Sequence, residues 1–242
     1  MGVFGLIFFL FFMIFSPTLQ KQMVALYERS GITALCNEKF EDASIRDALT
    51  EEILITSFEY QSRTPVLFTK HYADIIQEYD HHLTNATQSS SAAPVYFPPK
   101  ILEDKEGNEL IMLDGGIYAN DPALFAYMHA KFNLHKKKIR IISVGTGTTE
   151  ADQISPNPNA YEWILHAGYL LGTTEQYSHG FLVSLLASDY HMFQIVMEKS
   201  ISLDSISDSE LLMEYGMQIV EKQREELHQV CRELVDQWMR SS

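Results

Sequence analysis

Several residue patterns that mark common functional classes are missing from this chain of 242 residues. It has only two cysteines, Cys36 and Cys231, which excludes a disulfide framework and a C-x-x-C metal site. Its histidines include no H-E-x-x-H arrangement of zinc ligands. We therefore expect no metal site. We expect free thiols, with a single bridge between the two cysteines as the alternative.

Basic residues are also few. The chain has 18 Lys and Arg against 32 Asp and Glu, which gives a net charge of −14. Proteins that bind nucleic acid present a basic surface to the phosphates, so this balance argues against nucleic acid as a partner. It also disfavours docking to anionic lipid over most of the surface.

The amino-terminal residues lack positive charge as well. No Lys or Arg precedes Lys21, and residues 3–15 form a continuous apolar run. A membrane-spanning helix needs about 17–25 apolar residues, and a signal peptide needs a basic start and a small-residue cleavage site. Three interpretations of residues 1–20 stay open: a marginal membrane anchor, an atypical signal segment, or a buried element of a larger fold. Under these interpretations the protein is either cytoplasmic or membrane-associated.

The rest of the chain alternates between strand and helix patterns. Residues 53–60, 65–72, 109–114 and 139–144 are strand-like, and residues 192–197 could add a late strand. Helices are expected over 17–30, from 42 onward, over parts of 73–93, over 120–132 and 161–188, and in an amphipathic tail over 207–238. This alternation predicts an α/β fold with parallel strands. We divide the chain into an apolar segment (1–20), a main domain (21–200) and a carboxy-terminal helical segment (201–242).

One acidic turn stands out within this pattern. The strand E-L-I-M-L-D ends at Asp114 and runs into Gly115 and Gly116. Asp-Gly is a common turn signal, because Asp bonds nearby amides and Gly adopts unusual backbone angles at no cost. Taken alone, Asp114 is therefore most simply a turn residue. The alternative is a catalytic carboxylate.

The surroundings of this turn favour the catalytic interpretation. S-S-A-A-P-V-Y-F-P-P precedes it over residues 90–99, and S-V-G-T-G follows over 143–147, with Asn120 and Pro122 shortly after the two glycines. Together the three stretches resemble the patatin-like phospholipase family of lipid acyl hydrolases. The resemblance is close over residues 53–149. The family often has a second Asn where this chain has Asp121, which still suits a helix cap.

The resemblance implies a partial three-layer patatin-like fold, with a mostly parallel central sheet flanked by helices. It implies that Asp114 is the proton acceptor of a Ser–Asp dyad, with Gly115, Gly116 and Asn120 shaping the supporting turn. A serine hydroxyl needs such a base to attack an ester carbonyl. The expected substrate is a lipid or phospholipid acyl ester. No metal or organic cofactor is implied.

The rest of the family's catalytic machinery is not found in the sequence. No serine lies in a G-x-S-x-G nucleophile elbow, and no Gly-rich oxyanion stretch precedes the matched region. Ser89, Ser90 and Ser91 fall in the small-residue segment, where they are expected to be structural. Only the Asp half of the dyad is therefore expected in this chain. The alternative is a catalytically inactive module that binds lipid or a protein partner. In either case we expect membrane contact, or an activating or complementing chain, to keep the molecule soluble.

Overall fold

The computed structural model describes residues 25–149, 156–157, 174–199 and 201–241. The chain divides into two compact units, unit 1 (residues 1–129) and unit 2 (residues 130–242), and each is described by itself. The apolar run over residues 3–15 lies outside the described residues. Within the described ranges, no helix is both long and apolar enough to cross a membrane.

Unit 1 contains a four-stranded sheet in the order β2-β1-β4-β3. Its strands are β1 (Leu54–Glu59), β2 (Thr64–Thr69), β3 (Lys100–Glu103) and β4 (Glu109–Asp114). All three pairings are antiparallel. Short hairpin loops join β1 to β2 and β3 to β4, and the central pair of β1 and β4 brings together strands that are distant in the chain. The three predicted strands over residues 53–114 are confirmed. The prediction of a mostly parallel sheet is wrong for this sheet, because all of its pairs are antiparallel.

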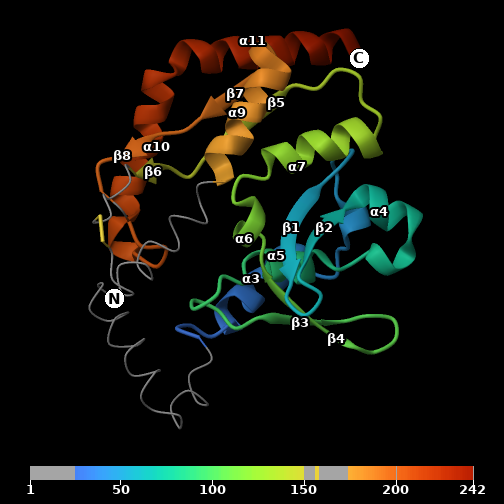
Figure 1. The fold of residues 1–242 in the computed structure, drawn as a ribbon. Coiled ribbons are helices and arrows are strands. Elements are labelled where there is room, and N and C mark those ends of the chain that lie inside the picture. Colours follow the sequence, from blue (N-terminus) through green and yellow to red (C-terminus); the bar gives the residue numbers. More distant parts are fainter. Residues whose placement is uncertain (1–24, 150–155, 158–173, 200, 242) are drawn as a thin grey trace. The chain divides into compact units, whose positions relative to one another are not determined.

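Short helices cover the sheet of unit 1 (Figure 1). The helix α5 (Leu83–Ser90) packs against β1, β3 and β4, and α3 (Ser30–Phe40) packs against α5. The core lies between these layers and consists of Ile45, Phe68, Ala73, Ala86, Leu102 and Met112. Two more helices, α6 (Gly116–Ala119) and α7 (Ala123–Met128), follow β4 directly.

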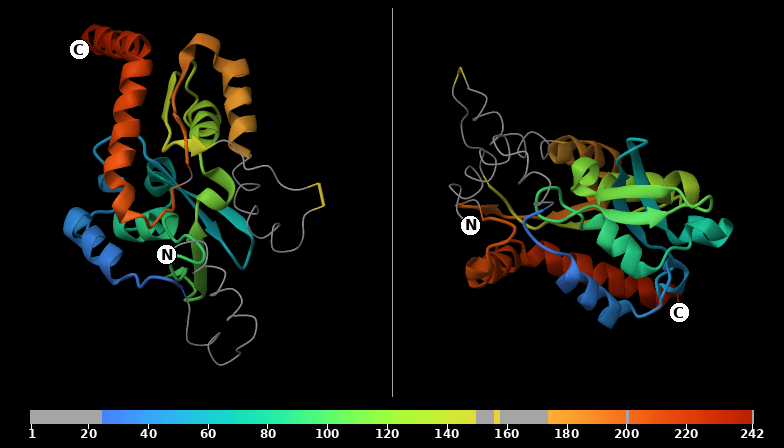
Figure 2. Two further views of the ribbon diagram at one scale, coloured as in Figure 1. Left: turned by 90° about the vertical axis from the view of Figure 1, so that its left-hand side faces the viewer. Right: turned by 90° about the horizontal axis from the view of Figure 1, so that it is seen from below.

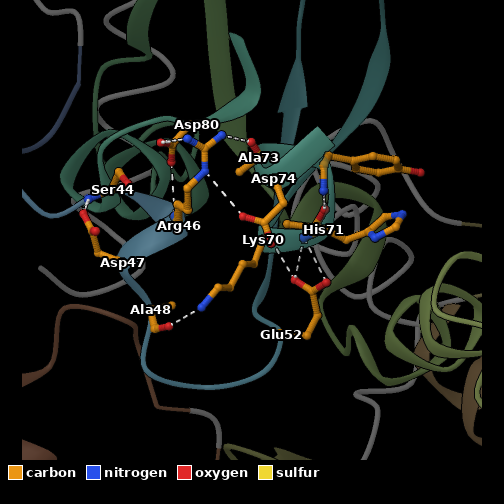
Figure 3. Close-up of polar contacts among 12 residues, drawn as sticks. Ser44, Arg46, Asp47, Ala48, Glu52, Lys70, His71, Ala73, Asp74 and Asp80 are labelled. Atoms are coloured by element: carbon orange, nitrogen blue, oxygen red, sulfur yellow. Dashed lines mark hydrogen bonds and ion pairs between the residues drawn. The ribbon is translucent and has the colours of Figure 1, made fainter. Parts of the chain in front are cut away.

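The helix expected from residue 42 is only one turn, η1 (Ile45–Asp47), and residues 25–29 of the helix expected over 17–30 are not helical. Ser44 and Asp47 form a capping box around η1. Arg46 then holds the chain by pairing with Asp74 at 3.4 Å and with Asp80 at 3.7 Å (Figure 3). These tertiary contacts replace further helical turns.

Glu52 joins the same polar region to the start of β1 (Figure 3). Its carboxylate accepts hydrogen bonds from the backbone N–H of Lys70 at 2.6 Å and of His71 at 3.0 Å, at the start of α4 (Lys70–Ile75). The Oε2 atom, which accepts from His71, also lies 3.1 Å from Nε2 of His129, and His129 is buried. One acidic side chain thus links β1, α4 and the end of α7.

The hairpin between β3 and β4 is closed by Asp104. Its Oδ1 atom accepts from the N–H groups of Glu106 at 2.9 Å and Asn108 at 2.8 Å. Gly107 has φ of 81°, a conformation that favours glycine. The hydrogen bonds that close this turn therefore come from residues of the turn itself.

Unit 2 contains two small parallel sheets. The strand β5 (Ile141–Val144) pairs with β7 (Tyr190–Phe193), and β6 (Thr148–Thr149) pairs with β8 (Val196–Met197). The parallel part of the prediction is thus confirmed only for these pairs. The strand predicted over 139–144 is confirmed with shifted bounds, whereas the single strand predicted over 192–197 is two short strands, β7 and β8, in different sheets.

Helices cover both faces of the pair formed by β5 and β7 (Figure 2). Successive residues of a strand face opposite sides. Tyr190 accordingly contacts His179 of α9 (Thr174–Leu186), at 3.1 Å between hydroxyl and Nδ1. His191 contacts Glu226 of α11 (Arg224–Ser241), at 2.9 Å between Nδ1 and Oε1. With α10 (Ser209–Lys222), α11 confirms the predicted helical tail, which breaks at Gln223.

Candidate active site

Asp114 is the last residue of β4 and lies opposite Ser57 of β1. The Ser57 hydroxyl donates a hydrogen bond of 2.7 Å to the carbonyl oxygen of Leu113, and Ser57 is fully buried. This bond fastens the end of β4 to β1. It also occupies the hydroxyl of the serine that stands beside Asp114 in the sheet.

Gly115 is needed for a close approach of two backbones. A Cβ atom at this position would lie 2.2 Å from Oγ1 and 2.4 Å from the carbonyl oxygen of Thr56. Both distances are far shorter than a van der Waals contact. The φ of Gly115 is −66°, an angle that every residue adopts, so the requirement for glycine is one of space.

The segment after α5 holds the turn by main-chain bonds. The N–H of Asp114 donates to the carbonyl of Ala92 at 3.1 Å, and the N–H of Gly115 donates to the carbonyl of Ser90 at 3.3 Å. Ala92 has no exposed surface. The small-residue segment and the Asp-Gly-Gly turn, predicted separately from the sequence, are therefore in direct contact.

The carboxylate of Asp114 is half-buried and bends back over its own turn. Its Oδ1 atom accepts a hydrogen bond of 2.6 Å from the N–H of Gly116. A Cβ atom at Gly116 would lie 2.9 Å from that oxygen and 3.2 Å from Oδ1 of Asn120, so Gly116 keeps the space between the two side chains open. Within the described part of the chain, no other hydrogen bond reaches this carboxylate.

Burial raises the pKa of Asp114 above the ordinary value of an aspartate, and the hydrogen bond from Gly116 opposes that rise. A carboxylate with a raised pKa is a stronger base than a free one. This is the electrostatic property that a proton acceptor needs.

The serines near the turn are held in structural positions. Ser89 is fully buried, and its hydroxyl has no hydrogen-bond partner among the described residues. The Ser91 hydroxyl donates to the carbonyl of Thr87 at 2.8 Å, within its own helix end. Within the described ranges, no serine hydroxyl is hydrogen-bonded to Asp114.

The residues after the turn anchor the helices that follow. The Tyr118 hydroxyl donates to the carbonyl of Val66 at 3.0 Å, and burial raises the pKa of Tyr118 to about 12. Asp121 accepts at Oδ1 from the N–H of Ala123 at 2.9 Å. The N-cap of α7 is Pro122 and not Asp121 as predicted, so the helix starts one residue later than expected, at Ala123.

The third stretch that the sequence singled out lies in unit 2. Gly145 follows β5, and a Cβ atom there would lie 2.3 Å from the Gln194 side chain. The N–H of Gly147 donates to Oε1 of Gln194 at 2.7 Å, and Gly147 has φ of 96°. The two glycines therefore make space for the Gln194 amide, which ties the turn to the end of β7.

The sequence does not reveal two residues that shape the site, Thr56 and Ser57, or the Glu52–His129 pair elsewhere in unit 1. Thr56 and Ser57 sit inside a correctly predicted strand, but only the register of β1 against β4 places them beside Asp114. Glu52 and His129 are 77 residues apart in the chain. No group of three or more metal-ligating side chains occurs in the ranges that the structure covers.

Comparisons with a family model and with known proteins both point to patatins. Residues 9–127 match the family model described as Patatin-like phospholipase. The chain is 26% identical over 229 residues to Patatin-07 of Solanum tuberosum, covering 81% of this chain and 59% of that protein. It is 28% identical over 193 residues to Patatin-16 of the same species, covering 70% of this chain and 50% of the relative. The chain thus spans roughly half to three-fifths of the length of these relatives.

Proposed function

Because the chain belongs to the patatin-like phospholipase family, we propose that it forms part of a lipid acyl hydrolase acting on lipid or phospholipid acyl esters. Within it, Asp114 is the proton acceptor of a Ser–Asp dyad. The observation that carries this assignment is the state of its carboxylate. It is half-buried, has a raised pKa, and accepts one hydrogen bond from the described residues.

The chemistry follows from that state. A serine hydroxyl attacks an ester carbonyl only as its proton leaves, and a nearby carboxylate can take that proton. Desolvation of Asp114 brings its basicity closer to that of the hydroxyl, which favours the transfer. Gly116 leaves one side of the carboxylate unobstructed. Asn120, beside Gly116, helps to shape the turn.

The serine of the dyad is not among the serines of this sequence, since none has the G-x-S-x-G surroundings that expose a nucleophile. Ser57, Ser89 and Ser91 are buried or already bonded in unit 1. We therefore assign the nucleophile and the oxyanion donors to a segment outside these 242 residues, in the same protein or in a complementing chain.

A chimera tests this assignment directly. The part of Patatin-07 that precedes the aligned region would be fused to this chain, and hydrolysis of a short-chain p-nitrophenyl ester would be followed. Asp114→Asn is expected to lower kcat by about 10²–10⁴-fold, the usual contribution of a general base. The matched control is Asp121→Asn, which removes a carboxylate seven residues away that accepts the N–H of Ala123 at the start of α7.

A chimera that hydrolyses the ester equally well with Asp114→Asn would disprove the role of Asp114. A fluorophosphonate probe, which reacts with activated serines, is expected to label none of the serines of the chain by itself. Labelling that disappears with a single Ser→Ala change would disprove the assignment of the nucleophile to another segment.

The second candidate function is a catalytically inactive module that binds lipid or a protein partner. The observation in its favour is the lack of an elbow and of an oxyanion stretch anywhere in the sequence. The coding sequence upstream of Met1 distinguishes the two functions. An in-frame Gly-rich stretch followed by G-x-S-x-G favours the hydrolase, and an upstream region without these motifs favours the module.

The finer features of the family fold belong to the same proposal. In a complete domain we expect three layers, with parallel strands such as β5 and β7 continuing into a larger sheet. The division into segments 1–20, 21–200 and 201–242 also stays a prediction. Membrane contact and an activating or complementing chain are the partners that this proposal allows.

A further inference from the structure

The positive charge of this acidic protein is concentrated in one place. Residues 131–140 contain five of its 18 Lys and Arg residues, and residues 122–149 contain no Asp or Glu at all. The rest of the chain has 13 basic residues against 32 acidic ones. At physiological ionic strength the Debye length is about 8 Å, so distant acidic residues are largely screened from this segment.

The structure presents most of this charge to solvent. Lys131, Lys137 and Lys138 are exposed, and no acidic side chain within the described ranges pairs with any of them. Arg140 differs, because it pairs with Asp189 at 3.4 Å and with Glu233 at 2.8 Å. The three unpaired lysines, which we call the basic patch, are therefore available to an outside anion.

The backbone of the segment is ordered. The π-helix η3 (His129–Asn133) carries Lys131, and the N–H of Lys136 closes its end by donating to the carbonyl of Ala130 at 2.9 Å. His135 adopts φ of 53° in that closure. Lysines at a helix end also favour the helix dipole, but this effect fades within one turn. It therefore does not account for Lys137 and Lys138, which lie beyond the closure.

An exposed aromatic ring accompanies the patch. Phe132 follows Lys131 in η3 and is 65% exposed. Phenylalanine next to unpaired lysines is the combination found where proteins rest on membranes, since the ring enters the acyl boundary while the lysines meet lipid phosphates. An acidic protein would use the lysines but gives no comparable role to the exposed ring. Single-stranded nucleic acid could stack a base on the ring, but the net charge of −14 opposes binding of a polyanion.

We propose that Lys131, Phe132, Lys137 and Lys138 form a docking surface for an anionic lipid bilayer. The choice of a bilayer over other anions rests in part on the proposed lipid hydrolase function. The surface would bring the protein to the interface where lipid esters are found, while the acidic remainder keeps the contact local and reversible.

Vesicle sedimentation of the full chain tests the proposal. The vesicles would contain either phosphatidylcholine alone or phosphatidylcholine with 30% phosphatidylserine, at low and high salt. Each lysine near an anionic surface contributes about fivefold to the partition coefficient. The triple variant Lys131→Gln/Lys137→Gln/Lys138→Gln is therefore expected to bind phosphatidylserine vesicles about 100-fold more weakly than the unmodified chain.

The matched control is Lys39→Gln/Lys105→Gln/Lys222→Gln, which removes the same charge from exposed lysines elsewhere. It should bind as the unmodified chain does. Phe132→Ser should weaken binding at both salt concentrations, and Tyr60→Ser, which changes a ring that is 60% exposed, should not. Urea unfolding of each variant checks that the fold is retained.

Three results would overturn the proposal. They are equal binding by the patch variant and the control variant, equal binding of both vesicle types by the unmodified chain, and binding to heparin without binding to vesicles. None of these measurements uses hydrolysis. A chimera in which Asp114 proves dispensable would therefore refute the dyad and leave the docking result unchanged.

Discussion

Replacing Gly115 with alanine tests the geometry on which the active-site assignment depends. The new Cβ atom would lie 2.4 Å from the carbonyl oxygen and 2.5 Å from the carbonyl carbon of Thr56. These are backbone atoms of β1, so no change of rotamer relieves the clash. Because Gly115 has an ordinary φ of −66°, the substitution adds no conformational strain of its own.

The magnitude follows from two effects. Overpacking of a close contact typically costs about 1–3 kcal/mol. If the turn moves away from β1, the hydrogen bond from Gly115 to the Ser90 carbonyl is also weakened, at about 1 kcal/mol. We expect Gly115→Ala to lower the free energy of unfolding of unit 1 by about 2–4 kcal/mol.

Two measurements are suited to this prediction. Urea unfolding followed by far-UV circular dichroism gives the change in stability. Amide hydrogen exchange at Asp114 and Gly115, whose N–H groups bond the carbonyls of Ala92 and Ser90, reports whether the turn itself has loosened. The matched control is Gly216→Ala in α10, where a Cβ atom would meet nothing within 4 Å. That change should stabilise the helix by about 0.5–1 kcal/mol.

An unchanged unfolding midpoint and unchanged exchange for Gly115→Ala would refute the reasoning, because the turn could not then pack against β1 as described. A loss of stability with unchanged exchange at Asp114 would show that the substitution disturbs another part of unit 1. It would disprove the idea that Gly115 determines the position of the carboxylate.

Three further predictions concern charged and titrating groups of unit 1. The pKa of Asp114 is raised in the fold, so its stabilising contribution is complete below the unfolded value of 3.8 and is lost as pH rises through the folded value. Asp114→Asn should therefore be more stable than the unmodified chain at pH 7 but not at pH 3, as measured by urea unfolding. Glu52→Ala should cost about 1–3 kcal/mol, since it strands the amide of His71 and the ring of His129, and Glu52→Gln should cost less in the same assay. Absorbance titration should find one tyrosine that ionises near pH 12 and is missing in Tyr118→Phe.

Much of the local structure of unit 1 could be read from the sequence. The strands β1, β2 and β4 follow from runs of β-branched and aromatic residues, and α7 follows from the Asp121-Pro122 start. These signals are local, so periodicity and capping are enough to find them. The helix α3 was not predicted, because its residues Ser30–Phe40 show no clear amphipathic pattern.

The arrangement of the strands could not be read in the same way. Strand and helix alternation suggested a parallel sheet, but the sheet of unit 1 is antiparallel: two of its pairs are hairpins, and the third joins the distant strands β1 and β4. Whether two strands pair directly or through a crossover depends on contacts between distant residues. The same is true of the pairing of Ser57 with Asp114, which no local pattern announces.

The candidate site shows the same division. Asp114 and its two glycines were found from the order of three short stretches. What those glycines do was not visible, since Gly115 is required by the backbone of Thr56 and Gly116 by the carboxylate itself. Spatial requirements of this kind depend on a neighbour that comes from another part of the chain.

The hairpin of β3 and β4 has a practical consequence for engineering the protein. Its self-closed turn at Asp104–Asn108 stands at one end of β4, and Asp114 stands at the other, about 17 Å away for five residues of strand. The bonds that hold the Asp114 turn come from Ala92 and Ser90, outside the hairpin tip. A fluorophore, an affinity peptide or new chain termini could therefore be placed next to Glu106 while the carboxylate keeps its setting.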